Sequence, residues 1–90
     1  MNPTLSVNVL YFAVLRERLG RDGETLQLPP DADVGAARAA LACLHPELAA
    51  LLPRVATAVN RTMAPDSQRL SDGDELALIP PVAGGCSNIY

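Results

Sequence analysis

The start of the chain alternates between apolar and polar residues with the period of a β-strand. Residues 5–12 read LSVNVLYF, and every second residue is apolar and typical of a buried face. These residues are Leu5, Val7, Val9 and Tyr11. The opposite face starts polar and becomes apolar only at Leu10 and Phe12. The pattern predicts a strand with one face against a core and a second face that is apolar at one end.

A second strand is predicted after a short helical connection. Residues 13–20 favour one or two helical turns, and Gly20 is placed to end them because glycine adopts the left-handed conformation easily. Residues 24–30, ETLQLPP, alternate again until two prolines stop the strand. The first two strands are therefore expected to form a hairpin-like pair.

The middle of the chain carries a longer helical pattern. Asp33 is a suitable N-cap, and the apolar residues after it recur at helical spacing. They are Val34, Ala37, Leu41, Leu44 and Leu48. Because a proline disfavours helix at the residue before it, the main helix is expected to end near His45, with a short further turn through Leu52.

Three strand segments are predicted after the helix. They are residues 54–60, a short strand around residues 67–70, and residues 75–81. One main helix with four or five strands predicts an α+β fold in which a single mixed sheet wraps on the helix, as in the ubiquitin-like β-grasp. The domain is expected to span residues 1–81, with residues 82–90 as a flexible tail.

Composition narrows the function classes. A chain of 90 residues makes one domain, and its net charge of −3 opposes binding to nucleic acid. All seven basic residues are Arg, so neither a lysine Schiff base nor a lysine acceptor for a ubiquitin-like modifier is available. No apolar run reaches membrane-spanning length and no signal peptide is evident, so we expect a cytoplasmic protein without a membrane partner. The two cysteines are then expected to be free thiols.

Catalytic chemistry inside the domain is not apparent. The only histidine, His45, precedes a proline at a helix end, which favours a surface or capping role. Asp72, Asp74 and Glu75 lie close together, but carboxylates beside a glycine are typical of a hairpin turn. A zinc site needs three or four ligands at characteristic spacing, and no phosphate-binding loop is present. We therefore expect no metal and no bound cofactor.

A family resemblance comes from several motifs together. They are VLYFAVLRERLG, AVNRTM and LSDGDELALIPPVAGG, which resemble the MoaD/ThiS family of ubiquitin-like sulfur carriers from about Val7 to Gly85. The branch that is most similar is the small subunit of molybdopterin synthase. The resemblance implies a carrier rather than an enzyme. In the family, a ubiquitin-activating-like adenylyltransferase uses ATP to adenylate the terminal glycine carboxylate, and sulfur then replaces AMP to give a thiocarboxylate.

The resemblance also assigns roles to individual residues. Gly85 would carry the acyl-adenylate and the thiocarboxylate, and Val82, Ala83 and Gly84 would form the tail that enters a partner's active site. Glycines suit a narrow channel because they have no Cβ, and the prolines before the tail stiffen its exit from the sheet. The sulfur-accepting partner would be an enzyme such as a molybdopterin synthase large subunit or a sulfhydrylase.

The partner must also hold the body of the domain. The alternation places Phe12 and Ile79 on the face away from the helix, and Met63 follows the third strand. With Pro80 and Pro81 they are expected to form the partner interface, since an exposed apolar patch usually marks one. The alternative is that they are ordinary covered sheet residues. A β-grasp interaction module without sulfur transfer would use the same patch and tolerate loss of the tail.

The sequence departs from the family pattern at one bond. Gly85 is followed by Cys86 and four more residues, and an amide cannot be adenylated as a carboxylate can. Four explanations compete: proteolytic removal of residues 86–90, a remnant of cloning, an N-to-S acyl shift at Cys86, or a domain that has lost sulfur transfer. We favour proteolysis, because some ubiquitin-like carriers resemble this chain in having a short extension that a JAMM-type zinc metalloprotease trims.

Overall fold

A five-stranded mixed sheet forms the body of the molecule in the computed structural model, which describes residues 4–80. The strands are β1 (Leu5–Tyr11), β2 (Gly23–Leu28), β3 (Ala56–Val59), β4 (Thr62–Met63) and β5 (Glu75–Ile79). Their order is β2-β1-β5-β3-β4, with β1 and β5 parallel and the other neighbours antiparallel. This mixed sheet confirms the predicted β-grasp.

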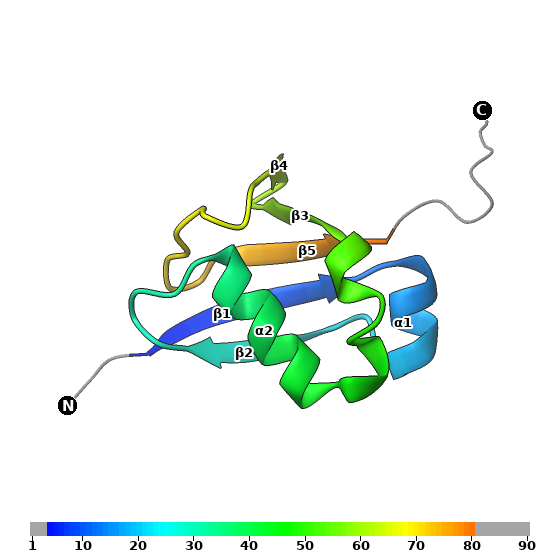
Figure 1. Cartoon of the computed structure of the whole chain (residues 1–90). Helices are drawn as coiled ribbons and strands as arrows, with labels where there is room; N and C mark the ends of the chain where they lie inside the picture. Colours follow the sequence, from blue (N-terminus) through cyan, green and yellow to red (C-terminus); the bar gives the residue numbers. More distant parts are fainter. Residues whose placement is uncertain (1–3, 81–90) are drawn as a thin grey trace.

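Two helices accompany the sheet. They are α1 (Ala13–Leu19) and α2 (Val34–Leu44), and two 3-10 turns follow α2 at Pro46–Leu48 and Leu52–Arg54. Figure 1 shows α2 crossing one face of the sheet and α1 beyond the end of β1. The predicted caps are confirmed, because the Asp33 side chain accepts a hydrogen bond from the Ala36 amide at 2.8 Å and Gly20 ends α1 at a φ of 69°.

The core lies between α2 and the inner face of the sheet. Its residues alternate along β1 and β5 and follow one side of α2 at helical spacing, which is why the sequence pattern identified most of them. The fully buried ones include Val7, Val9, Leu76, Leu78, Val34, Ala37 and Leu41. One member of the predicted helical stripe was wrong, since Leu44 is 53% exposed. The helix ends at Leu44, and His45 takes the inward position instead.

The predicted strand around residues 67–70 was also wrong. The chain reverses immediately after β3 through Asn60 and Arg61, which both have positive φ, and β4 follows at Thr62. Residues 66–70 lie against the start of α2 instead: Val34 donates to the Gln68 carbonyl at 2.9 Å and Gly35 to the Asp66 carbonyl at 2.9 Å. Only one isolated bridge, between Asp33 and Arg69, has strand-like geometry in this segment.

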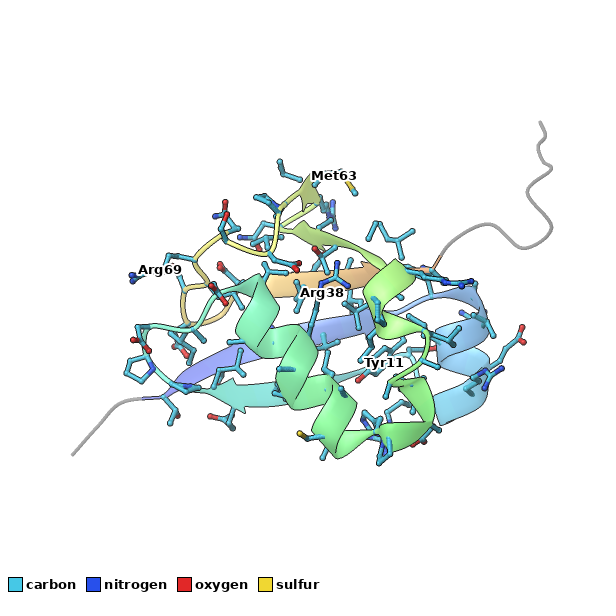
Figure 2. All side chains as sticks on the ribbon, in the orientation of Figure 1. Tyr11, Arg38, Met63 and Arg69 are labelled. Atoms are coloured by element: carbon cyan, nitrogen blue, oxygen red, sulfur yellow. The ribbon has the colours of Figure 1, made fainter. Side chains whose placement is uncertain are left out.

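Arg38 ties α2 to the segments around it. Its guanidinium donates to the Leu52 and Val55 carbonyls at 2.5 Å each and to the Asp66 carboxylate at 2.8 Å. The side chain is mostly buried and lies between α2 and the sheet in Figure 2. The arginine therefore supplies donors to two carbonyls of the irregular segment after α2, of which the Leu52 carbonyl also accepts from the Val55 amide at 3.1 Å.

Candidate functional site

The outer face of the sheet, away from α2, is apolar at one end. Ala58 pairs with both Met63 and Ala77 across the strands, and Ala56 pairs with Ile79, so these side chains share a face. Phe12 continues the alternation of β1 with an extended backbone and falls on the same face as Leu10. The face defined by Phe12, Met63 and Ile79 is called here the outer apolar face.

These three residues are unusually exposed for large apolar side chains. Phe12 is 44% exposed, Met63 63% and Ile79 40%, and Figure 2 shows Met63 at the sheet edge on β4. Ala58 and Ala77 lie between them and are buried, although they stand apart from the main core. Small residues between larger ones make a low apolar surface, which is suited to a flat partner surface.

The other end of the outer face is polar. Ser6 and Asn8 of β1 pair with Gln27 and Thr25 of β2. The Gln27 side chain also donates to the Ser6 hydroxyl at 2.9 Å. The apolar end is the one at which β1 and β5 finish together, since these strands are parallel. Figure 1 shows both strand ends at the same side of the molecule.

The predicted carrier tail follows directly from this end. Pro80 is the last residue that the structure describes and is half-buried. The predicted tail and cleavage residues, and Pro81 of the predicted interface, lie outside the described residues, so their roles stay predictions. They are Pro81, Val82, Ala83, Gly84, Gly85 and Cys86.

A buried polar cluster lies behind the outer apolar face. The Tyr11 hydroxyl donates to Glu24 Oε2, and His45 Nε2 lies 2.5 Å from the same oxygen. Because a carboxylate only accepts, Nε2 must carry the proton of this hydrogen bond. Arg21 reaches the second oxygen, Oε1, at 3.2 Å. The Tyr11 and His45 rings meet edge to face with centroids 6.3 Å apart.

The cluster raises the pKa of Tyr11 and lowers the pKa of Glu24. Burial, and then the hydrogen bond and charge of Glu24, raise the pKa of Tyr11 well above its usual value. Burial acts to raise the pKa of Glu24 as well. The hydrogen bonds from Tyr11 and His45 and the electrostatic effects of His45 and Arg21 together outweigh it, so the pKa of Glu24 is lowered.

Sequence reasoning missed this cluster. It placed His45 at a helix cap, which is confirmed, but its side chain is only 14% exposed. Two signals were available. His45 lies four residues after Leu41 and so continues the buried stripe of α2. Glu24 lies on the same face of β2 as the buried Leu26 and Leu28.

The acidic residues before β5 form a turn, as the sequence indicated. Asp72 accepts from the Ser6 amide at 2.7 Å, and Asp74 accepts from the Ser71 amide at 2.8 Å. The Asn60 side chain donates to Asp74 at 3.0 Å and accepts from the Glu75 amide at 3.0 Å. Their hydrogen bonds stabilise the turn, and this use gives no sign of acid–base catalysis.

Enclosed sites are missing from residues 4–80. That part of the chain has no pocket and no group of three or more His, Cys, Asp or Glu residues arranged for a metal ion. Among the same residues, no helix has the length and apolar character needed to cross a membrane. The chemical features that remain are the outer apolar face and the strand end that leads to Gly84 and Gly85.

Comparison with known proteins decides the family, because residues 9–85 match the ThiS family. The chain belongs to the ThiS family. The match runs from β1 to the second glycine of the tail, and it leaves residues 86–90 outside. The nature of residues 86–90 stays a prediction.

Individual relatives resemble this ThiS-family chain over nearly their whole length. It is 43% identical over 82 residues to the molybdopterin synthase sulfur carrier subunit of Mycobacterium tuberculosis, covering 90% of this chain and 99% of that protein. The crystal structure of SAMP1 from Haloferax volcanii has a TM-score of 0.79 and 34% identity, over 89% of this chain and 99% of that one. A complex of subunits 1 and 2 of the molybdopterin-converting factor from Helicobacter pylori also matches, with a TM-score of 0.66, 26% identity, and coverage of 90% and 100%.

Proposed function

We propose that the protein is a sulfur carrier that is thiocarboxylated at Gly85 after residues 86–90 have been removed. The observation that carries the proposal is the family match, which ends at the second glycine of the motif PPVAGG. Relatives at 33–43% identity are named molybdopterin synthase sulfur carrier subunits. The protein acts as a substrate or non-catalytic subunit of partner enzymes and is not itself an enzyme.

The chemistry requires a free carboxylate at Gly85. An adenylyltransferase of the ubiquitin-activating type brings ATP, the Gly85 carboxylate attacks its α-phosphorus, and pyrophosphate leaves. Hydrosulfide then attacks the acyl carbon of the adenylate, which forms the C–S bond, and AMP departs with the C–O electron pair. The product is a thiocarboxylate, and Gly84 has no Cβ to hinder its entry into an active site.

The extension makes activation conditional on cleavage. In the full chain, the Gly85 carbonyl forms an amide with Cys86, whose nitrogen is a much poorer leaving group than a phosphate and offers no carboxylate to ATP. Hydrolysis of this bond adds one water and releases the peptide CSNIY. A JAMM-type zinc metalloprotease has the chemistry for this step, because zinc activates water at neutral pH.

Docking of the partner uses the outer apolar face. Phe12, Met63 and Ile79 are exposed on the same side of the sheet, and Ile79 is followed by Pro80, the last described residue before the tail. A partner that covers this face also lies close to Pro80, from which the chain continues to the predicted tail. In the Helicobacter pylori structure, subunit 1 forms a complex with subunit 2. By analogy, we propose a molybdopterin synthase large subunit as the sulfur-accepting partner.

A sulfhydrylase that makes a sulfur metabolite is the second candidate acceptor, and the extension at Cys86 favours it. The competing class is a β-grasp interaction module that uses the outer apolar face without transferring sulfur. These candidates share a cytoplasmic setting, where ATP and the activating enzyme are available.

Cleavage is tested by mass measurement of the intact full chain. After incubation with a JAMM-type metalloprotease from the same organism, the expected product ends at Gly85. A Gly85→Val variant is the matched control, because a β-branched side chain at the scissile bond should prevent the cut. A chain that stays intact, or is cut at another bond, contradicts the proposed maturation.

A further inference from the structure

Phe12, the only phenylalanine in the chain, is held in an exposed position. It is 44% exposed, and it stands between two residues with unusual environments. On one side is Tyr11, which is 2% exposed and hydrogen-bonded through its hydroxyl. On the other side is Ala13, which has a φ of 51°. A large apolar side chain is normally buried against other apolar groups, so the neighbours of Phe12 have to keep it exposed.

The Tyr11 side fixes the end of β1 from three directions. The Tyr11 amide donates to the Asp22 carbonyl at 2.8 Å, and Tyr11 lies opposite Leu78 of β5 in the sheet. The Tyr11 hydroxyl reaches Glu24 of β2, which also binds His45 at the end of α2. One carboxylate therefore joins β1, β2 and α2 directly behind Phe12.

The Ala13 side stores backbone strain. A left-handed conformation costs a residue with a Cβ about 1–2 kcal/mol, and such a residue persists only where its surroundings force it. Here the next turn is fixed, because Leu15 is fully buried and its amide donates to the Phe12 carbonyl at 3.1 Å. Strained residues of this kind gather at functional positions.

We propose that the Tyr11–Glu24–His45 cluster is a positioning clamp, which together with the strained Ala13 holds Phe12 in the orientation that the docking partner meets. The role follows from the placement of three hydrogen-bonding side chains from three elements behind one exposed residue. Glu24 closes the clamp because it is the common acceptor. The inference rests on the proposed docking role of Phe12.

The clamp is expected to open in acid. The titratable and charged groups around Glu24 are Tyr11 from β1, His45 from the end of α2, and Arg21 before β2, with the Arg16–Asp22 pair near the same turn. The pKa of Glu24 is lowered in the folded protein, so its contribution is present above the unfolded value and lost as the pH falls through the folded value. Protonation then removes the negative charge of Glu24, which weakens its hydrogen bonds with Tyr11 and His45.

The first test follows amide signals of the full chain by NMR during an acid titration. The Phe12 amide is expected to shift with the same midpoint as the Glu24 carboxyl, and E24Q is expected to abolish that shift. The Asp66→Asn variant is the matched control, since it makes the same change at the exposed Arg38 ion pair and leaves the clamp intact. A Phe12 signal that ignores the Glu24 titration, or still titrates in E24Q, overturns the proposal.

Hydrogen exchange of the Leu15 amide tests the clamp without changing the pH. Its bond to the Phe12 carbonyl reports on the turn, and Y11F is expected to raise its exchange rate about tenfold through local opening. H45A is expected to do the same, while H45Q retains an N–H donor and keeps exchange near the wild-type rate. Unchanged exchange in both Y11F and H45A contradicts a clamp, and denaturant unfolding shows that each variant is folded.

Binding to the molybdopterin synthase large subunit separates this inference from the proposed function. F12A is expected to weaken binding strongly, and Y11F by about three- to tenfold through lost positioning. If F12A weakens binding and Y11F does not, the clamp is overturned and the docking face stands. If F12A itself has no effect, the docking role of Phe12 fails.

Discussion

A few side chains form the hydrogen-bonded polar groups inside the domain. Tyr11, Glu24 and His45 share one hydrogen-bonded oxygen inside a chain that otherwise has an apolar core. Replacing any member leaves the others with a buried, unmatched polar group, so their effects are expected to be non-additive. The same reasoning applies to Arg38, whose guanidinium serves two carbonyls and one carboxylate.

Tyr11 is expected to titrate later than an ordinary tyrosine. Its pKa is raised, so its contribution to stability is fully present below the unfolded value near 10 and is lost as the pH rises through the folded value. Ultraviolet absorbance of a Y90F variant isolates this group, because the chain has two tyrosines. Glu24→Gln should bring the midpoint down toward 10. A Y90F titration at the ordinary midpoint in folded protein contradicts the buried hydrogen bond.

Arg38→Met is expected to destabilise the fold by about 1–3 kcal/mol, because it keeps the apolar stem but removes the arginine donor from the Val55 carbonyl and leaves the Leu52 carbonyl with the Val55 amide alone. Asp66→Asn should cost under about 1 kcal/mol, since Asp66 is 65% exposed and exposed ion pairs contribute little. Urea denaturation measures both. Equal losses for the two variants would show that the ion pair, and not the backbone contacts, holds Arg38.

At the scale of elements, alternation and helical spacing predicted the strands and helices that bury a full face. β1, β2 and α2 bury every second or every third to fourth residue, and β5 buries a short continuous apolar run, so their patterns are visible without the fold. The short β4 has no such pattern, because both of its residues are exposed. The position of β4 depends on a two-residue turn. The segment 67–70 resembled a strand in the sequence, although it lies against the start of α2.

The same limit applies to the candidate site. Phe12 and Ile79 were chosen by alternation and Met63 by its place after the third strand, and the structure shows all three exposed. Leu44 could not be separated from the buried stripe, because its exposure depends on where α2 ends and on the bond that draws His45 inward. The polar cluster joins residues 13 to 34 positions apart, and such pairing comes only from tertiary structure.

The turn between β3 and β4 offers a pair of opposite predictions. Asn60→Ala should destabilise by about 2–3 kcal/mol, because it removes side-chain bonds to Asp74 and Glu75 and because Ala adopts a φ of 51° less readily than Asn. Arg61→Gly should stabilise by about 0.5–1 kcal/mol, since glycine adopts the φ of 71° without strain. Thermal unfolding decides both signs, and a destabilising Arg61→Gly contradicts the assigned turn geometry.

Under the proposed function, the whole molecule divides into a body that docks and a tail that carries sulfur. The mixed sheet brings the ends of β1 and β5 together, so that the outer apolar face and Pro80, the last described residue before the tail, occupy the same end of the domain. This arrangement lets one partner surface bind the body while its active site receives the glycines. The ThiS-family match covers both parts and excludes the last five residues.

Deletion of residues 82–90 separates a carrier from an interaction module. The carrier account predicts that sulfur transfer is abolished while the body still binds its partner through the outer apolar face. Met63→Asp in the full chain is the complementary variant and should weaken binding without changing stability by more than about 1 kcal/mol, since Met63 is 63% exposed. Sulfur transfer that survives the deletion rules out a carrier.

The most direct measurement is the intact mass of the chain ending at Gly85 after incubation with ATP, a ubiquitin-activating-like adenylyltransferase and a sulfur donor. The account predicts a mass increase equal to the replacement of one oxygen by sulfur, located at Gly85, and no change in the full chain that ends at Tyr90. An unchanged mass in the shortened chain, with an enzyme that thiocarboxylates its own carrier, would contradict the sulfur-carrier function.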